Sequence, residues 1–311
     1  MVTLLNFFDP KQIFIKMNEK LNHQRLKNER VATYCVCCGS SKIRSTPSIL
    51  MPFIAERAFG WRPIEIDESW GLHSIKKGYA YSICNTLNCI NCGLVFLDIR
   101  FSEQELNNIY YEYRGEKYVE LRDFYEPGYK QRNQSLINGF EYNDKIESFL
   151  NQFLKLPVSI LDWGGDTGKN TPFKNSNNTF DIYDISNALV IEGARSIDKD
   201  YALNNKYDLI ICSNVLEHVS YPLNILLDIK ICMKENTILY IEVPFEEIMM
   251  NGGTSAYLNK KHWHEHINFY SELSLVKLIE SVGLKSLSFN TLTIAAEGKK
   301  IYLIQIACQI A

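Results

Sequence analysis

Two close pairs of cysteines stand in the first third of the sequence. Cys35 and Cys38 form the first pair, Cys89 and Cys92 form the second, and a glycine follows each pair. Tetrahedral zinc takes four such soft ligands, and each glycine lets backbone amides turn towards the thiolate sulfurs. The spacing therefore predicts one structural zinc ion held by the four cysteines. Four sulfur ligands close a site, so we expect no catalysis there.

Three alternatives to this zinc site stay open. Cys37 and Cys84 are spare thiols that could replace one of the four ligands, and the cysteines could instead be buried free thiols. A zinc finger that binds nucleic acid is the functional rival. The formal net charge of -3 and the pI near 6.1 argue against that rival, because phosphate contacts require an excess of basic residues. We therefore expect no nucleic-acid partner.

A second stretch with chemical potential is "ILDWGGDTG", residues 160–168. Asp162 ends an apolar run, Gly164, Gly165 and Gly168 follow it, and Asp184 ends the next apolar run. In a doubly wound sheet such glycines let the backbone approach a nucleotide, and an acid about twenty residues later binds the ribose hydroxyls. The alternative is a tight strand-to-helix bend that binds no ligand.

Histidines are the candidates for proton transfer. One is His218 in "NVLEHV", and three more lie in "HWHEHINFYS", residues 262–271. A histidine near a cofactor suits acid-base chemistry, but His218 could also cap a strand-to-helix turn. His262, His264 and His266 alternate at a period of two, so they could share one side of a strand as metal ligands, with Glu265 pointing away.

The elements that must position these residues change in type along the chain. After Pro157, apolar strand-like runs alternate with helical patterns, and the runs 209–212 and 238–241 suit parallel strands buried on both faces. Two closing strands, 285–294 and 299–310, are joined by the short turn "AAEGKK", which predicts an antiparallel hairpin at one edge. The sequence predicts an α/β fold with a doubly wound, mostly parallel sheet.

Four segments follow from these patterns. Residues 1–33 contain an N-terminal surface helix, 34–101 form a small zinc-binding module, 102–157 form a helical connector rich in tyrosine, and 158–311 form the α/β domain. Ser102, with Glu105 three residues later, predicts the start of the first connector helix. The first ten residues read neither as a signal peptide nor as a membrane span, so we expect a cytoplasmic protein without membrane insertion.

The α/β domain resembles the class I S-adenosylmethionine-dependent methyltransferases. Their first motif runs acid, any residue, glycine, any residue, glycine, any residue, glycine, and in residues 162–168 Asp166 takes the middle glycine place. The resemblance implies S-adenosylmethionine as cofactor and a seven-stranded Rossmann-like sheet with a C-terminal antiparallel hairpin. It also implies that the cofactor contacts lie in the loop and at the strand ends: Asp162, Gly164, Gly165, Gly168, Asp184, Ser213 and Asn214.

A narrower resemblance is to sugar C-methyltransferases. These enzymes also place two such cysteine pairs before the methyltransferase domain, followed by a tyrosine-rich segment whose counterpart here is residues 110–118, and we expect Tyr118 near the cofactor. They carry a histidine after the fourth strand and a segment like "HEHxxYFS" after the fifth. His218, Glu265 and His266 match those places, which implies that these three residues are the acid-base groups.

The resemblance and the residues together predict methyl transfer to a small-molecule acceptor. We expect a sugar or nucleotide-linked sugar of surface polysaccharide biosynthesis, methylated on oxygen or carbon. The alternatives are a small-molecule O-methyltransferase with a non-sugar acceptor, and a non-catalytic zinc-containing binding protein. The sequence shows no counterpart of the further substrate-binding domain of sugar C-methyltransferases, so the acceptor is expected to lie between the module, the connector and the insert 244–266.

Overall fold

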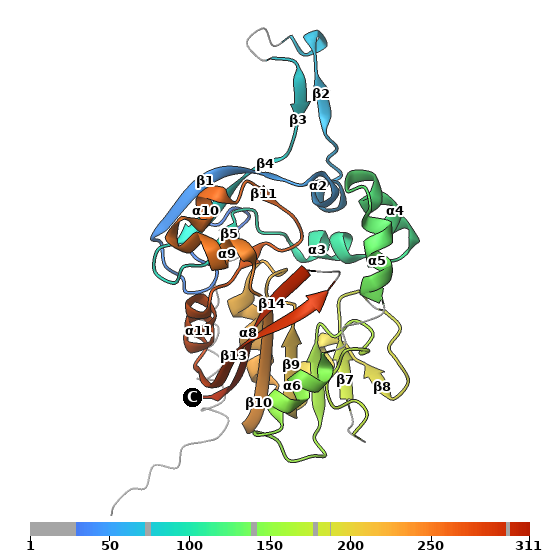
Figure 1. Cartoon of the computed structure of the whole chain (residues 1–311), viewed down its shortest axis with the longest axis vertical. Helices are drawn as coiled ribbons and strands as arrows, with labels where there is room; N and C mark the ends of the chain where they lie inside the picture. Colours follow the sequence, from blue (N-terminus) through green and yellow to red (C-terminus); the bar gives the residue numbers. More distant parts are fainter. Residues whose placement is uncertain (1–28, 72–75, 138–141, 177–179, 187, 297–298) are drawn as a thin grey trace, which may run out of the picture.

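The computed structural model describes residues 29–71, 76–137, 142–176, 180–186, 188–296 and 299–311. The helix predicted within residues 1–33 lies almost entirely outside the described residues. Two larger sheets and one small two-stranded sheet form the β structure, and helices surround them (Figure 1).

The larger sheet has seven strands in the order β13-β14-β10-β9-β6-β7-β8. Strands β6 to β10 are parallel to one another, whereas β14 is antiparallel to both β10 and β13. This arrangement confirms the mostly parallel seven-stranded α/β sheet. Its strands are β6 (Ile160–Trp163), β7 (Phe180–Tyr183), β8 (Ala194–Ser196), β9 (Tyr207–Ser213), β10 (Met233–Pro244), β13 (Leu284–Ala296) and β14 (Lys299–Ile310).

Both faces of this sheet are buried, which explains why its strands read as unbroken apolar runs. Helix α6 (Asn143–Leu150) packs on the face that carries Ile160, Leu209 and Ile238. Helices α8 (Pro222–Ile231) and α11 (Glu272–Ser281) pack on the other face, which carries Leu161, Ile210 and Leu239. Successive residues of one strand therefore enter two different cores.

The second sheet belongs to the predicted zinc-binding module but is not built from that segment alone. Its order is β11-β1-β4-β5-β12, with β1 (Ile43–Leu50), β4 (Ile83–Cys89) and β5 (Val95–Leu97) in the middle. The two edge strands, β11 (His262–Trp263) and β12 (Asn268–Phe269), come from the chain after β10. The segment 262–269, placed by the sequence in the α/β domain, thus completes the sheet of the module.

The connector carries helices α3 (Glu103–Tyr110), α4 (Glu116–Tyr125) and α5 (Tyr129–Ile137). Helix α3 begins with a capping box, in which the Ser102 side chain accepts from the Glu105 backbone N–H and the Glu105 side chain accepts from the Ser102 N–H. This confirms the predicted helix start. Helix α2 (Pro52–Phe59) of the module packs against α3 and α4, so module and connector share one core.

A narrow arm extends from the module, away from both sheets (Figure 1). It consists of β2 (Ile64–Ile66) and β3 (Gly78–Ala80), which pair antiparallel. Among the described helices, none has the length and apolar character needed to cross a bilayer.

Candidate active site and metal cluster

The glycine-rich loop after β6 turns through left-handed backbone conformations. Gly164 has φ +82° and Gly168 has φ +77°, and a Cβ on Gly164 would come within 2.4 Å of Val215 Cγ2. Asp166, at the middle glycine place, also has a positive φ of +51°. Aspartate tolerates the left-handed region better than most residues, so the departure from glycine keeps the backbone path of the loop.

Asp184 ties the loop to the end of β7. Its Oδ2 accepts a hydrogen bond of 2.9 Å from the Asp166 backbone N–H, and its Oδ1 accepts one of 2.7 Å from Ser186 N–H. Asp162 lies beneath the loop, where its Oδ2 accepts from Thr171 Oγ1 at 2.6 Å. Burial raises the pKa of Asp162 to about 7. The structure therefore brings the two predicted acids to the same edge of the sheet, one buried and one facing outwards.

Ser213 and Asn214 end the neighbouring strand β9. The Ser213 hydroxyl donates to Glu242 Oε1 at 2.8 Å, and Asn214 Nδ2 donates to the same oxygen at 3.2 Å. Asn214 has φ +53°, which redirects the chain beside the glycine-rich loop. Tyr142, just before α6, also donates to Glu242 Oε1 at 2.8 Å, so this buried carboxylate anchors the strand end from below.

A cavity of about 1140 Å³ opens above these strand ends. Gly164, Asp166, Asp184 and Asn214 line it from the α/β domain, and its other walls come from the module and from α3. Among the tyrosines of the connector, the cavity is lined by Tyr110 and Tyr113. Tyr118 is instead buried beneath them, with its ring against Phe53 and Tyr113 and its hydroxyl on Glu265. The structure places Tyr118 with Glu265 and Arg122 rather than with the glycine-rich loop.

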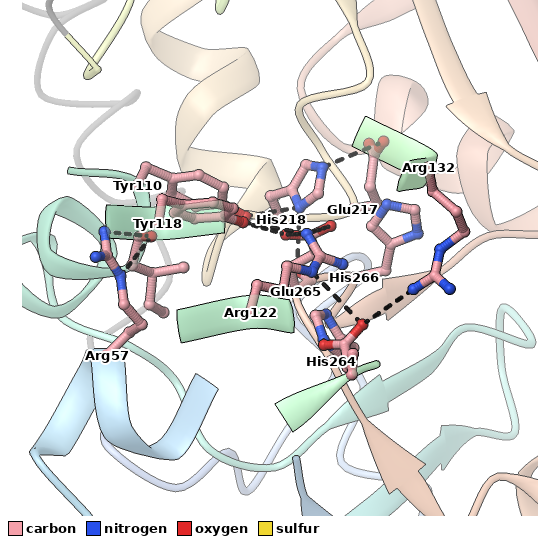
Figure 2. A network of polar contacts seen from close by, with 12 residues as sticks. Arg57, Tyr110, Tyr118, Arg122, Arg132, Glu217, His218, His264, Glu265 and His266 are labelled. Carbon is pink, nitrogen blue, oxygen red and sulfur yellow. Dashed lines mark hydrogen bonds and ion pairs between the residues drawn. The ribbon is translucent and has the colours of Figure 1, made fainter. Parts of the chain in front are cut away.

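His218 lies on the wall of the same cavity, in the loop after β9. Its Nδ1 is 2.8 Å from Tyr110 Oη and 3.1 Å from the Glu265 carbonyl oxygen. The His266 ring lies against the His218 ring, with 4.7 Å between centroids, and its Nδ1 is 2.7 Å from Glu246 Oε1. The structure thus brings His218 and His266 together from segments far apart in the sequence (Figure 2).

The two histidines differ in their electrostatic surroundings. Burial lowers the pKa of His218 to about 3, so this imidazole is neutral near pH 7. Burial also acts to lower the pKa of His266, but the hydrogen bond to Glu246 and the charge of Glu217 outweigh it and raise the pKa to about 9. Burial raises the pKa of Glu217 to about 8.

Glu265 forms an ion pair with Arg122 of α4. Arg122 Nη1 lies 3.1 Å from Glu265 Oε1 and 3.2 Å from Oε2, and Tyr118 Oη donates to Oε2 at 3.2 Å (Figure 2). Burial by itself would raise the pKa of Glu265, but Arg122 lowers it to about 2. Glu265 is therefore a fixed carboxylate whose backbone carbonyl orients His218.

The comparisons with known proteins agree with this geometry. Residues 135–288 match the family model described as a methyltransferase domain, and this span contains the glycine-rich loop, Asp184, His218 and His266. The chain therefore contains a methyltransferase domain. No curated protein matches the chain.

Solved structures similar to this methyltransferase include three at low identity. The 1,6-didemethyltoxoflavin N1-methyltransferase of Burkholderia thailandensis, bound to S-adenosylhomocysteine, is 14% identical, with a TM-score of 0.45 over 61% of this chain and 88% of that one. Magnesium protoporphyrin IX methyltransferase from Synechocystis PCC 6803 is 14% identical, with a TM-score of 0.40 over 58% and 86%. A glycopeptide N-methyltransferase bound to sinefungin is 8% identical, with a TM-score of 0.41 over 56% and 95%.

The four predicted cysteine ligands of the methyltransferase meet in one cluster. Cys35 Sγ lies 3.6 Å from Cys92 Sγ, Cys38 Sγ lies 3.6 Å from Cys89 Sγ, and all four sulfurs lie within 4.8 Å of one another. Zinc–sulfur bonds of about 2.3 Å in a tetrahedron place sulfurs about 3.8 Å apart, which fits this spacing. Cys37 is not part of the cluster, because its thiol points to the Ser274 carbonyl oxygen at 3.0 Å. Cys84 lies beside Ser48 Oγ instead.

Sequence reasoning missed three charged residues of the site: Glu217, Glu246 and Arg122. Glu217 directly precedes His218 in "NVLEHV", a segment in which the sequence singles out only the histidine. Glu246 follows β10 in "PFEEIMM", where two acids after a strand end were a usable signal. Arg122 carries no local signal, because it meets Glu265 across 143 residues of sequence.

Proposed function

We propose that this methyltransferase methylates a sugar or nucleotide-linked sugar of surface polysaccharide biosynthesis, on oxygen or on carbon. The observation that carries the proposal is that His218 and Tyr110 line the same cavity as the glycine-rich loop. The resemblance of "HEHINFYS" to the segment of sugar C-methyltransferases supports the choice of acceptor.

The strand ends offer a site for the cofactor, which supplies an electrophilic methyl group on a sulfonium. Asp184 would bind the ribose hydroxyls, because each of its oxygens keeps a lone pair after accepting one backbone hydrogen bond. Gly164 would let the backbone lie close to the cofactor, and Asn214 would border it from β9. In this proposal the residues orient the cofactor and take no part in proton transfer.

The other half of the cavity suits a hydroxyl-rich acceptor. Side chains with several hydrogen-bonding atoms line it from α3 and α8, among them Gln104, Asn107 and Asn224. A volume of about 1140 Å³ exceeds what one drug-sized ligand occupies, so it suits two adjacent molecules. Methyl transfer is mainly a matter of positioning the acceptor and handling its proton. In this proposal the pair of His218 and His266 handles that proton, and Arg122 and Tyr118 hold Glu265 so that its carbonyl oxygen fixes the His218 ring.

We further propose that the cluster of Cys35, Cys38, Cys89 and Cys92 binds a structural zinc ion. The cluster fastens the start of the module to the turn between β4 and β5. Cys37, between the ligands, packs on α11 of the α/β domain, so zinc would also fix how the module meets that domain.

The proposal is tested by transfer of the labelled methyl group of S-adenosylmethionine to a panel of nucleotide sugars. We expect labelled product from at least one of them. Asp184→Asn should weaken S-adenosylmethionine binding by roughly 10- to 100-fold, because hydrogen bonds to a charged group contribute about 1.5–3 kcal/mol. Asp200→Asn, an exposed change on α7 (Lys199–Leu203), is the matched control. Cofactor binding with transfer to non-sugar phenols or amines, and to no sugar, would refute the sugar acceptor.

A further inference from the structure

Glu217 is a buried carboxylate with no hydrogen-bond donor opposite it. Its side chain is 2% exposed, and neither of its oxygens has a hydrogen-bond partner among the residues that the structure describes. A charge left buried without compensation is strongly destabilising, so native proteins pair such groups or use them to bind metals. As a protonated acid Glu217 has no acceptor for its proton, and as a carboxylate it calls for a positively charged partner at its oxygens.

The two histidines beside Glu217 both present the same ring nitrogen. His218 Nδ1 lies 3.1 Å from the Glu265 carbonyl oxygen, which can only accept, so Nδ1 carries the proton. His266 Nδ1 likewise donates to Glu246 Oε1. His266 must first give up its second proton, which a bound cation would displace; the lone pair of each imidazole is then on Nε2. His218 Nε2 lies 3.7 Å from Glu217 Oε1, so a lone pair faces a carboxylate, and a cation between them would remove the repulsion.

We propose that Glu217, His218 and His266 bind a divalent metal ion. One donor atom from each residue lies within 4.8 Å of the donors of the other two (Figure 2). Histidine ligands of metals almost always donate their second ring nitrogen to a carboxylate or a backbone carbonyl, and here Glu246 and the Glu265 carbonyl serve as those acceptors. Two nitrogens and one carboxylate leave coordination positions open, which is the arrangement of catalytic rather than structural metal sites.

The donor set and the charge select the kind of ion. Imidazole with carboxylate suits zinc, iron(II) or manganese(II), whereas calcium and magnesium prefer sites made of oxygens alone. A divalent ion also balances the two carboxylates, Glu217 as ligand and Glu246 behind His266. The metal would be distinct from the one at the cysteine cluster, where all ligands are sulfurs.

This site deepens the proposed function and rests on it for its role. Because His218 lines the cavity, an open coordination position can take an oxygen of the acceptor. The ion would bind that oxygen and polarise it, as metal ions in enzymes do for hydroxyl and carbonyl groups. With both ring nitrogens of each histidine engaged, the two histidines would hold the ion rather than take up a proton. The ion would lower the pKa of the bound oxygen, so that the acceptor proton could leave to solvent.

Metal content tests the site directly. The full-length protein is equilibrated with zinc, desalted, and its metal measured by mass spectrometry. We expect two ions per chain, and one ion per chain for Glu217→Gln and for His266→Gln. His262→Gln changes an exposed histidine on the same segment and should keep both ions. Glu246→Gln should weaken the second ion by roughly 10- to 100-fold, since it removes the acceptor behind His266.

Manganese(II) gives an independent readout, because it competes poorly for thiolates and its electron paramagnetic resonance signal reports binding. We expect protein loaded with only one zinc ion per chain, at the cysteine cluster, to bind one manganese(II), and Glu217→Gln loaded in the same way to bind none. One zinc per chain together with no manganese binding would overturn the site, as would two ions unaffected by Glu217→Gln. Calorimetry with S-adenosylhomocysteine, the product formed from S-adenosylmethionine, on the same samples separates the two proposals. Binding of S-adenosylhomocysteine without a second metal would overturn the metal site and leave the methyltransferase proposal standing.

Discussion

The ion pair of Arg122 and Glu265 should be the most sensitive contact between the connector and the active-site segment. The side chains are 11% and 14% exposed, and Arg122 Nη1 lies within 3.2 Å of both carboxylate oxygens. Arg122→Met keeps much of the packing against Phe53 and Tyr129 but leaves the Glu265 charge buried without its cation. Removing one partner of a buried pair costs about 3–5 kcal/mol.

The pKa of Glu265 gives a second route to the same magnitude. It lies at about 2 in place of 4.5, chiefly because Arg122 overcomes the effect of burial. At about 1.4 kcal/mol per pKa unit, the surroundings favour the ionised form by about 3 kcal/mol. A domain is stable by about 5–15 kcal/mol, so Arg122→Met should lose a large part of the free energy of unfolding.

Urea unfolding at pH 7 of the zinc-loaded protein measures this loss. The double variant Arg122→Met with Glu265→Gln should recover most of it, because no charge is then left buried and glutamine still accepts from Tyr118. Arg132→Met is the control, since the Arg132 side chain is 49% exposed and a surface pair contributes about 0–1 kcal/mol. The reasoning is refuted if Arg122→Met costs no more than Arg132→Met, or if the two changes in the double variant add their costs.

Two further outcomes concern the cysteine cluster and Lys260. Cys89→Ser should abolish binding of the structural zinc and lower the thermal midpoint of unfolding. Cys84→Ser changes a thiol outside the cluster and should keep the zinc. Equal zinc content in both variants would contradict the assignment of the zinc ligands. Lys260 lies over the rings of Trp263 and Phe269, and burial lowers its pKa to about 8. The unfolded chain binds more protons than the native protein between pH 8 and the ordinary value of 10.5, so the contribution of Lys260 to stability rises with pH across this window. Lys260→Met should remove that rise in unfolding measured from pH 7.5 upwards, and an unchanged pH profile would exclude the effect.

The parts of the fold that sequence reasoning recovers are those with local signals. Apolar runs predict β9 and β10, because strands buried on both faces have no alternation, and the capping box predicts the start of α3. The cysteine pairs predict which four sulfurs cluster, since short spacing within each pair places two sulfurs together before any tertiary contact forms.

The parts that it misses depend on contacts between distant segments. Strands β11 and β12 are two residues long and carry no periodic pattern, so nothing local shows that they flank β1 and β5. The burial of Glu217 likewise arises only when residues 264–267 fold over the loop after β9, where Ile267 N–H donates to the Glu217 carbonyl oxygen at 2.7 Å. The roles predicted for His218, Glu265 and His266 stay predictions.

The sheet shared between the module and the α/β domain has a consequence for folding during synthesis. When the nascent chain has emerged from the ribosome as far as residue 101, it contains β1, β4 and β5. The outer edges of β1 and β5 stay unpaired until β11 and β12 are synthesised, more than 150 residues later. Open edges of this kind invite pairing with other chains until they are covered. The loop that carries Glu265 and His266 lies between those two late strands, so the same step of synthesis that closes the edges also brings Glu265 and His266 against His218.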